Sequence, residues 1–298
     1  MKTTPSKYIV LAGTFFTSLS SIIIRFSEAP SLVISAYRML FTSLMLLIPV
    51  IMNSQGEFKN ISKKQYFLCT ISGIFLALHF ATWISSIKMT TIANSTILVS
   101  CSPIFVALAN YLFTKEKINR KMAFGISVSL AGTIIIALGS SGDSANNAML
   151  GNLLAFLGAI FVAGYLVIGG VVRKNMSAVI YVFIVYSVST FVLFIMCIVS
   201  KTPLYPYALK EFILFIALAF FCSILGHTVY NYMVKYVSST LISVSTLSEP
   251  IFASILALLI FREIPSIYTL IGGIIIISGI FYYLVTQNKE IETTKLRN

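Results

Sequence analysis

Residues 88–136 read KMTTIANSTILVSCSPIFVALANYLFTKEKINRKMAFGISVSLAGTIII, and residues 235–283 repeat their pattern 147 positions later. The matched pairs are Lys88 and Lys235, Pro103 and Pro250, Glu116 and Glu263, Gly125 and Gly272, and Gly132 and Gly279. Because every pair keeps the same offset, the sequence indicates an internal duplication. Each copy lies among apolar segments long enough to cross a bilayer, so we expect a duplicated membrane protein.

The composition supports this class of protein. With 58% apolar residues, 10% charged residues and a mean hydropathy of +0.95, a soluble fold would lack polar side chains for its surface. Runs of about 20 apolar residues predict helices, because strands of a membrane barrel would alternate in polarity. The ten predicted spans are 8–24, 32–52, 66–87, 92–113, 121–138, 150–172, 178–199, 211–233, 238–260 and 264–285.

Five spans in each copy place the second copy upside down in the membrane relative to the first. The predicted fold is therefore an all-α integral membrane protein with ten transmembrane helices in two inverted five-helix repeats. The predicted boundaries are 1–138 for the first repeat, 139–149 for a connecting loop, 150–286 for the second repeat and 287–298 for a cytoplasmic polar tail. Such repeats enclose a pathway near the middle of the bilayer, and alternating access follows as a hypothesis.

The net charge of +12 reflects membrane orientation rather than nucleic-acid binding. If the N-terminus is cytoplasmic, fifteen Lys and Arg residues lie in inner loops and tails and five in outer loops. This bias follows the positive-inside rule, so we expect a protein of the cytoplasmic membrane with both termini in the cytoplasm. The inner cations also suit contact with anionic lipid.

Motifs for energy-coupled or metal chemistry are absent from the sequence. It contains no G-x-x-x-x-G-K-[ST] loop, no H-E-x-x-H and no Cys-x-x-Cys, so we expect no cofactor, no metal and no enzyme activity. The four cysteines fall inside predicted spans, where they behave as small apolar residues, and we expect no disulfide. Any transport would be secondary or facilitated.

Two paired motifs carry a family resemblance. Residues 103–108 (PIFVAL) precede Lys115 and Glu116, residues 249–254 (EPIFAS) precede Arg262 and Glu263, and a glycine-bearing span follows each. With Arg38 and residues 79–88, they make the chain resemble an EamA-type member of the drug/metabolite transporter superfamily from about residue 8 to 285. The resemblance implies export or uptake of small metabolites, often amino acids, by inverted repeats. It does not imply one substrate.

Two charged residues lie well inside predicted spans. Glu249 lies about 16 Å deep, near the middle of a bilayer core of about 30 Å, and is a candidate coupling carboxylate for protons or a cation. Alternatively, it organises the helix break at Pro250 together with nearby hydroxyls. Arg38 lies about 9 Å inside its span. It either lines the pathway, as an anion site or as a partner for Glu249 or for a substrate carboxylate, or extends to the interface.

The remaining candidates for the pathway are polar residues within spans. His79 with Trp83, and His227 with Asn231, are pairs four residues apart on one helix face, and His79 and His227 occupy nearly equivalent positions, 148 residues apart. Each histidine either lines the pathway or bonds a neighbouring helix, and Trp83 is alternatively an interface anchor. Asn94 shares a span with Pro103, which like Pro250 marks a kink or a half-helix break. Glu116 and Glu263 are expected to cap helix ends or form salt bridges rather than gate.

The residues together predict a secondary transporter of small metabolites, with export as the expected direction and protons as a candidate coupling ion. The expected partners are a small-molecule substrate and the lipid bilayer, without nucleic acid. A membrane-embedded enzyme, a lipid flippase, a channel and a sensor are the alternative functions. Small residues repeat every four positions at Ala155, Ala159 and Ala163, which allows close helix packing within a monomer or between two subunits.

Overall fold

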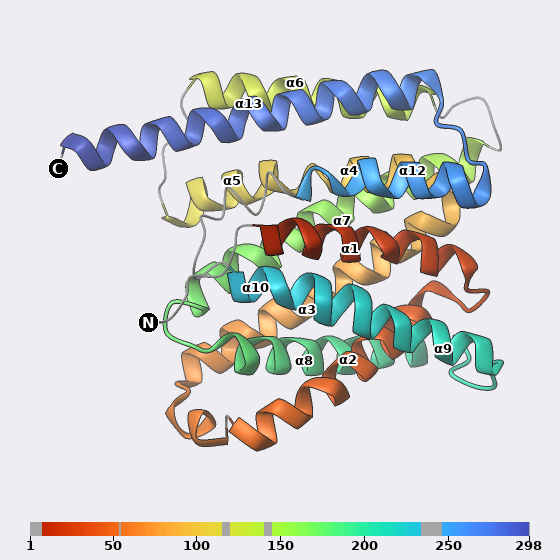
Figure 1. Cartoon of the computed structure of the whole chain (residues 1–298), viewed down its shortest axis with the longest axis vertical. Helices are drawn as coiled ribbons and strands as arrows, with labels where there is room; N and C mark the ends of the chain where they lie inside the picture. The colour runs from red at the N-terminus through yellow and green to blue at the C-terminus, as the bar shows by residue number, and fades with distance from the viewer. Residues whose placement is uncertain (1–7, 54, 115–119, 140–144, 234–245, 298) are drawn as a thin grey trace.

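The computed structural model describes residues 8–53, 55–114, 120–139, 145–233 and 246–297, and within them the only regular elements are helices (Figure 1). In chain order these are α1 (Tyr8–Phe26), α2 (Ser31–Asn53), the 3₁₀ helix η1 (Gln55–Asn60), α3 (Lys63–Met89), α4 (Ile92–Val99), α5 (Ser102–Thr114), α6 (Arg120–Gly139), α7 (Ala145–Val172), α8 (Ala178–Val199), α9 (Leu209–Ala217), the π-helix η2 (Leu218–Thr228), α10 (Val229–Met233), α12 (Glu249–Phe261) and α13 (Ile267–Arg297). The predicted all-α class is confirmed.

Seven helical segments are long and apolar enough to cross a membrane: Ile9–Phe26, Ser31–Met52, Lys63–Met89, Ile92–Ala109, Asn147–Val172, Ala178–Val199 and Leu209–Met233. Two shorter apolar helices, Glu249–Phe261 and Ile267–Tyr283, accompany them. A multi-pass membrane protein is therefore supported, and the count of ten spans stays a prediction. The segment expected as a polar tail from residue 287 continues α13 as helix to Arg297.

The helices of the two halves pack in matched pairs. Helices α6 and α13, α2 and α8, and α4 and α12 each occupy equivalent places in the duplicated sequence and pack on one another, and α1 on η2 mirrors α3 on α7 (Figure 1). Two hydrogen bonds join residues 147 positions apart, from Ser43 Oγ to Thr190 Oγ1 at 3.4 Å and from Ser129 Oγ to the Ile276 carbonyl at 3.2 Å. Contact between equivalent residues is what a twofold relation between the halves produces.

Large apolar side chains cover the outside of the bundle. Phe191, Leu138 and Ile274 are each more than 60% exposed, although they belong to three different helices. Such surfaces suit contact with lipid acyl chains, whereas in water they would be unfavourable. Polar side chains are instead collected inside, among them Arg38 and Asn94.

Helices α6 and α13 approach one another until their backbones touch. A Cβ atom added to Gly125 would lie 2.8 Å from the Gly279 carbonyl oxygen, and one added to Gly132 would lie 2.6 Å from that of Gly272. The reciprocal distances from Gly279 and Gly272 are 2.7 and 2.8 Å, so two glycine pairs hold the antiparallel helices. Glycine serves here because no side chain fits between the helices.

This contact predicts a selective loss of stability. Gly279→Ala would place a methyl group against the Gly125 carbonyl, and because backbone cannot move aside, we expect destabilisation of about 1–3 kcal/mol. The matched control is Gly170→Ala in α7, where nothing lies within 4 Å of an added Cβ and alanine is the better helix former. Apparent unfolding temperatures in detergent would test the pair. Equal temperatures for the two variants would contradict the predicted contact.

Candidate functional site

Two helix interruptions bring backbone ends into the bundle. Helix α4 ends at Val99 and α5 begins at Ser102 beside Pro103, while α12 begins at Glu249 beside Pro250. Proline lacks an N–H and cannot continue the preceding helical hydrogen bonds. Glu249 thus occupies the first turn of α12, where the free N–H groups and the helix dipole favour a negative charge.

Arg38 lies on α2 and is 0% exposed, so its side chain does not extend to the surface. Its Nε donates to Ser223 Oγ of η2 at 2.9 Å, and its guanidinium carbon lies 4.3 Å from the centre of the Phe80 ring. Nη1 and Nη2 are both buried and have no hydrogen-bond partner within the described part of the chain. Burial of unsatisfied charged donors is costly, which makes this position unusual for a purely structural arginine.

His79 and Trp83 extend this arrangement along α3. Their rings stack with centroids 5.9 Å apart, and His79 Nδ1 lies 2.9 Å from the Gly158 carbonyl oxygen of α7. A carbonyl oxygen only accepts, so Nδ1 carries the proton and donates. Trp83 is 3% exposed, which places it inside the bundle rather than at its surface. Its buried Nε1 also lacks a partner among the residues that can be described.

A chain of contacts connects Arg38 to Glu249. Phe80, under the Arg38 guanidinium, packs on His227, and His227 packs on Tyr230. Tyr230 Oη lies 3.2 Å from Thr17 Oγ1, which in turn lies 3.3 Å from Glu249 Oε2. Arg38 and Glu249 are thus joined through intervening side chains and form no direct ion pair. We call the following residues the central polar cluster: Thr17, Arg38, His79, Trp83, Ser223, His227, Tyr230 and Glu249.

The π-helix η2 explains the spacing of the two histidines. His79 and His227 differ by 148 positions, one more than the offset of the repeat. His227 lies near the end of η2. A π-helix inserts an extra residue relative to an α-helix, which accounts for the slip of one residue. Ser223, which accepts the hydrogen bond from Arg38 Nε, also lies in η2, and π-helical turns are frequent at functional sites.

Asn231 lies beside the cluster rather than in it. Its Nδ2 donates to Tyr165 Oη at 2.7 Å and to the His227 carbonyl at 2.8 Å. The backbone carbonyl of Asn231 accepts a hydrogen bond from Arg173 Nε at 3.3 Å. Asn231 therefore joins His227 to Arg173, which lies at one end of the bundle.

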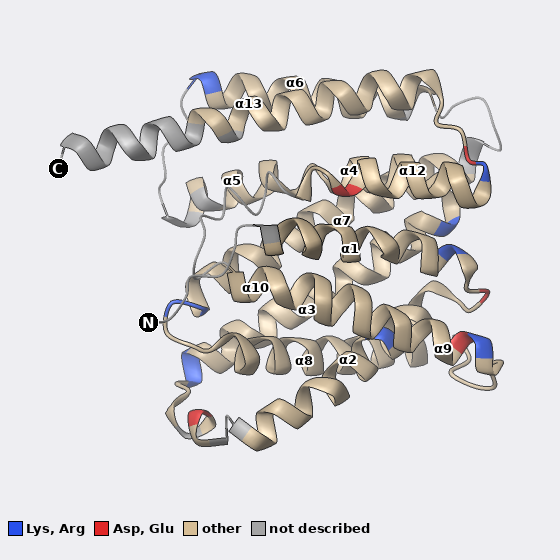
Figure 2. Ribbon diagram, in the orientation of Figure 1, with Lys and Arg blue, Asp and Glu red and all other residues tan. Residues whose placement is uncertain are grey.

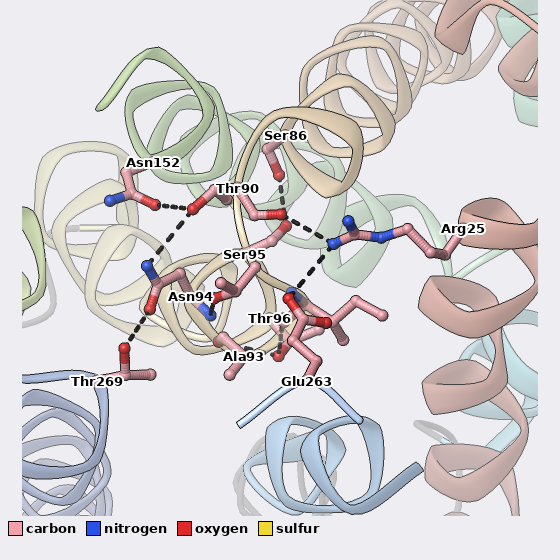
Figure 3. A network of polar contacts seen from close by, with 12 residues as sticks. Arg25, Ser86, Thr90, Ala93, Asn94, Ser95, Thr96, Asn152, Glu263 and Thr269 are labelled. Atoms are coloured by element: carbon pink, nitrogen blue, oxygen red, sulfur yellow. Dashed lines mark hydrogen bonds and ion pairs between the residues drawn. The ribbon is translucent and has the colours of Figure 1, made fainter. Parts of the chain in front are cut away.

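Asn94 belongs to a separate polar network at the start of α4 (Figure 3). Its Oδ1 accepts from Thr269 Oγ1 of α13 at 2.7 Å, and Thr90 Oγ1 donates to Asn152 Oδ1 of α7 at 2.8 Å. Asn94 Nδ2 lies 3.4 Å from Thr90 Oγ1 and completes the network. The structure thus gives Asn94 a bridging place between helices and does not bring it to Arg38.

Arg25 and Glu263 close the same end of the bundle (Figure 3). Arg25 Nη2 lies 3.6 Å from Glu263 Oε1 and donates to the Thr90 carbonyl at 2.9 Å. Glu263 Oε1 also accepts from the backbone N–H of Ile92, the first residue of α4, at 3.0 Å. We call these two residues with Ile92 the Arg25–Glu263 clasp. It combines the expected helix-end capping with an ion pair.

A second polar tie secures the turn between α1 and α2. Lys88 Nζ donates to the carbonyls of Ser27 and Ala29 at 3.0 and 2.5 Å. Glu211, at the start of α9 and 5% exposed, accepts from the hydroxyl of Ser27 and from the Glu28 N–H. Charged residues gather at this end of the ribbon in Figure 2.

The opposite end of the bundle contains a pocket of about 860 Å³. It lies between η1, the start of α3, the turn from α7 to α8 and the end of α10, on the side where α1 begins and α13 ends (Figure 1). Arg173 and Lys174 line it together with Glu57. Because Arg173 bonds to Asn231, the pocket adjoins the residues that lead to His227.

The sequence alone missed several members of these sites. Thr17, Ser223 and Tyr230 are ordinary span residues in the linear sequence. Only the packing of η2 on α1 and α2, and of α10 on α1, brings them to the charges. Glu211 carried a signal, because an acidic residue in the first turn of a helix is stabilised there. Glu116, Lys115 and Lys235, the sequence counterparts of residues at the clasp end, lie outside the described residues.

A family match covers most of the chain. The sequence model of the EamA-like transporter family matches residues 6–138 and again residues 149–285. The chain belongs to the EamA-like transporter family. This EamA-like transporter is 25% identical over 272 residues to the pseudopaline exporter CntI of Pseudomonas aeruginosa, covering 90% of this chain and 91% of the exporter.

Other relatives of the EamA-like transporter have less specific names. An uncharacterized transporter of Archaeoglobus fulgidus is 25% identical over 222 residues, covering 74% of this chain and 75% of that one. The transporter YetK of Bacillus subtilis, also uncharacterized, is 24% identical over 301 residues, covering 95% of this chain and 88% of its own. A solved crystal structure matches with a TM-score of 0.66 at 16% identity, over 93% of this chain and 96% of the other. That likeness shows a shared fold.

Proposed function

We propose that this EamA-like transporter is a secondary transporter that exports small metabolites, amino acids or related compounds, across the cytoplasmic membrane. One observation carries the proposal: a buried arginine and a carboxylate face the same interior cluster, in a chain whose family consists of transporters. Ionisable groups inside a membrane bundle mark the route of a substrate or an ion. The name of the pseudopaline exporter supports export as the direction.

The proposed mechanism is alternating access between two inverted repeats, residues 1–138 and 150–286, with ten spans in all. The matched helix pairs and the contacts between residues 147 positions apart support this division. In a bundle with such a twofold relation, exchange of the two repeats' conformations opens the centre to alternate sides.

In this mechanism the structure corresponds to a state closed at the Arg25–Glu263 clasp. The pocket of 860 Å³ at the other end would be the entry, and it would face the cytoplasm if both termini are cytoplasmic, as the positive-inside bias predicts. A substrate would pass Arg173 and Asn231 before it reaches His227 and the central polar cluster. Glu249 would bind and release the coupling proton.

Efflux measurements test the function directly. Cells loaded with a mixed pool of labelled metabolites would be compared with and without the chain, each in the presence and absence of a protonophore. We expect selective loss of one amino-acid-like solute that depends on the chain and on the pH gradient. Efflux equal to that of the empty vector for every solute would reject export.

The rival functions predict different flux. A carrier saturates with substrate in proteoliposomes, whereas a channel conducts in proportion to the gradient. A membrane enzyme would form product without flux. Saturation of flux is therefore the expected result, and either of the other two results would overturn the carrier.

A further inference from the structure

We propose that Arg38 is the anchor for a carboxylate group of the transported solute, which it binds through Nη1 and Nη2. The inference rests on the proposed function, since it names the chemistry of the ligand at the same cluster. It starts from the two guanidinium nitrogens of Arg38 that lack partners within the described helices.

Within the described structure, protein groups occupy one face of the guanidinium and its Nε. Phe80 covers one face at 4.3 Å, and Ser223 Oγ takes the hydrogen bond from Nε at 2.9 Å. The two remaining nitrogens form the fork that matches the two oxygens of a carboxylate. A planar acid bound there would satisfy both donors at once, which a hydroxyl or an amine would not.

The neighbouring groups favour an acceptor-rich ligand as well. Trp83 Nε1 is a second buried donor without a partner among the residues described, and its ring stacks on His79, which packs on Phe80. The region thus offers an excess of donors around one fixed positive charge. A solute with a carboxylate fits this excess, whereas a simple cation would be repelled by Arg38.

An arginine that stabilises the fold and one that binds a ligand differ in how their removal changes the stability of the protein. Removal of a structural arginine leaves partners unsatisfied and destabilises the fold. Arg38 has only Ser223 as a hydrogen-bond partner in the described structure, so removal of its buried charge should relieve an unfavourable burial. We expect Arg38→Met to unfold at the same temperature as the parent or at a higher one in the absence of ligand. A strongly lowered unfolding temperature would overturn the proposal.

Trp83 provides the readout of binding, because it is the only tryptophan in the chain. The purified protein in nanodiscs would be titrated with leucine, its deaminated acid 4-methylpentanoate and its amide leucinamide, while tryptophan emission is recorded. We expect a saturable change with the two acids and none with the amide. Arg38→Gln should weaken the response to the acids at least tenfold, and Arg38→Lys should recover part of it because it restores the charge without the fork.

Arg120→Gln is the matched control, since Arg120 is exposed at the start of α6, away from the cluster. It should bind the acids as the parent does. If Arg38 only neutralised Glu249, Arg38→Gln would weaken the binding of acids and amides equally. The difference between acid and amide therefore decides the role of Arg38. Equal responses to acid and amide in the parent would overturn the proposal.

Transport in proteoliposomes separates this inference from the proposed function. Carboxylate-dependent emission without flux would reject the transporter and keep the carboxylate site. Saturable flux of a solute with an unchanged KM in Arg38→Gln would keep the transporter and reject the site.

Discussion

A Glu249→Gln variant should reach the membrane at the level of the parent and lose transport driven by a pH gradient. Glutamine has nearly the same shape, and its side-chain oxygen can still accept the hydrogen bond from Thr17 Oγ1. The first turn of α12 should therefore form as before. An amide, however, cannot bind and release a proton, so the step that we propose to couple transport to the gradient is lost.

The measurement is efflux of the identified solute with an imposed pH gradient, compared with exchange of labelled for unlabelled solute in the absence of a gradient. We expect a loss of at least tenfold in gradient-driven efflux, with exchange retained, because exchange does not require release of the proton. Glu28→Gln is the matched control, since its side chain is 87% exposed at the turn after α1. Full gradient-driven efflux by Glu249→Gln would remove the coupling role.

A covalent link across the Arg25–Glu263 clasp should arrest transport completely. Cysteines at positions 25 and 263, joined by a cleavable thiol crosslinker long enough to replace the two side chains, would hold α1 and the end of α12 together. In the proposed mechanism this end must open for release, so the linked protein would bind solute and not turn over. Cleavage of the linker should restore flux.

The native cysteines and a second linked pair make this test specific. Cys69, Cys101, Cys197 and Cys222 are all buried and free. Variants with only one of the two introduced cysteines, at position 25 or at position 263, measure any reaction of the crosslinker with these native thiols. The control link joins Phe124→Cys and Tyr282→Cys, whose parent rings lie 5.8 Å apart on α6 and α13. Those helices touch through backbone at the glycine pairs, so a link there should leave flux unchanged. Transport by the clasp-linked protein would show that this end does not open.

Glu263→Gln offers a milder version of the same test. The variant keeps an acceptor for the Ile92 N–H and loses the charge opposite Arg25. Because the pair is partly exposed, we expect only about 1 kcal/mol or less in favour of opening. A modest increase in labelling of a cysteine placed at Thr90 by an impermeant maleimide would report it.

Periodicity and offset were sufficient for the broad architecture. The apolar runs predicted helices because backbone groups in a bilayer must bond within their own segment. The pairs at a constant offset of 147 predicted a duplication, and Ser129 with Ile276 are in fact in contact at that offset. The depth of Glu249 within its predicted span made it a candidate, and in the structure α12 begins at this residue, beside Pro250.

The places of the proposed pathway residues were less predictable one by one. Arg38, His79, Trp83, His227 and Glu249 come together, but Asn94 instead bridges α4 and α13. An asparagine that faces a pathway and one that bridges two helices look alike in sequence, because a buried amide needs a partner whichever helix supplies it. Distinguishing them requires the identity of the neighbouring helix, which a linear pattern does not contain.

The sequence by itself determined the membrane class, the helical segments and the duplication, because these follow from local hydrophobicity and from repetition along the chain. Only the tertiary structure decided which charges remain without partners: it placed Phe80 and Ser223 around Arg38 and left two guanidinium nitrogens unpaired among the described residues. It also assigned Glu263 to Arg25 and to the start of α4. The physical reason is that satisfaction of a buried polar group depends on atoms from distant segments, which packing alone brings within hydrogen-bond distance.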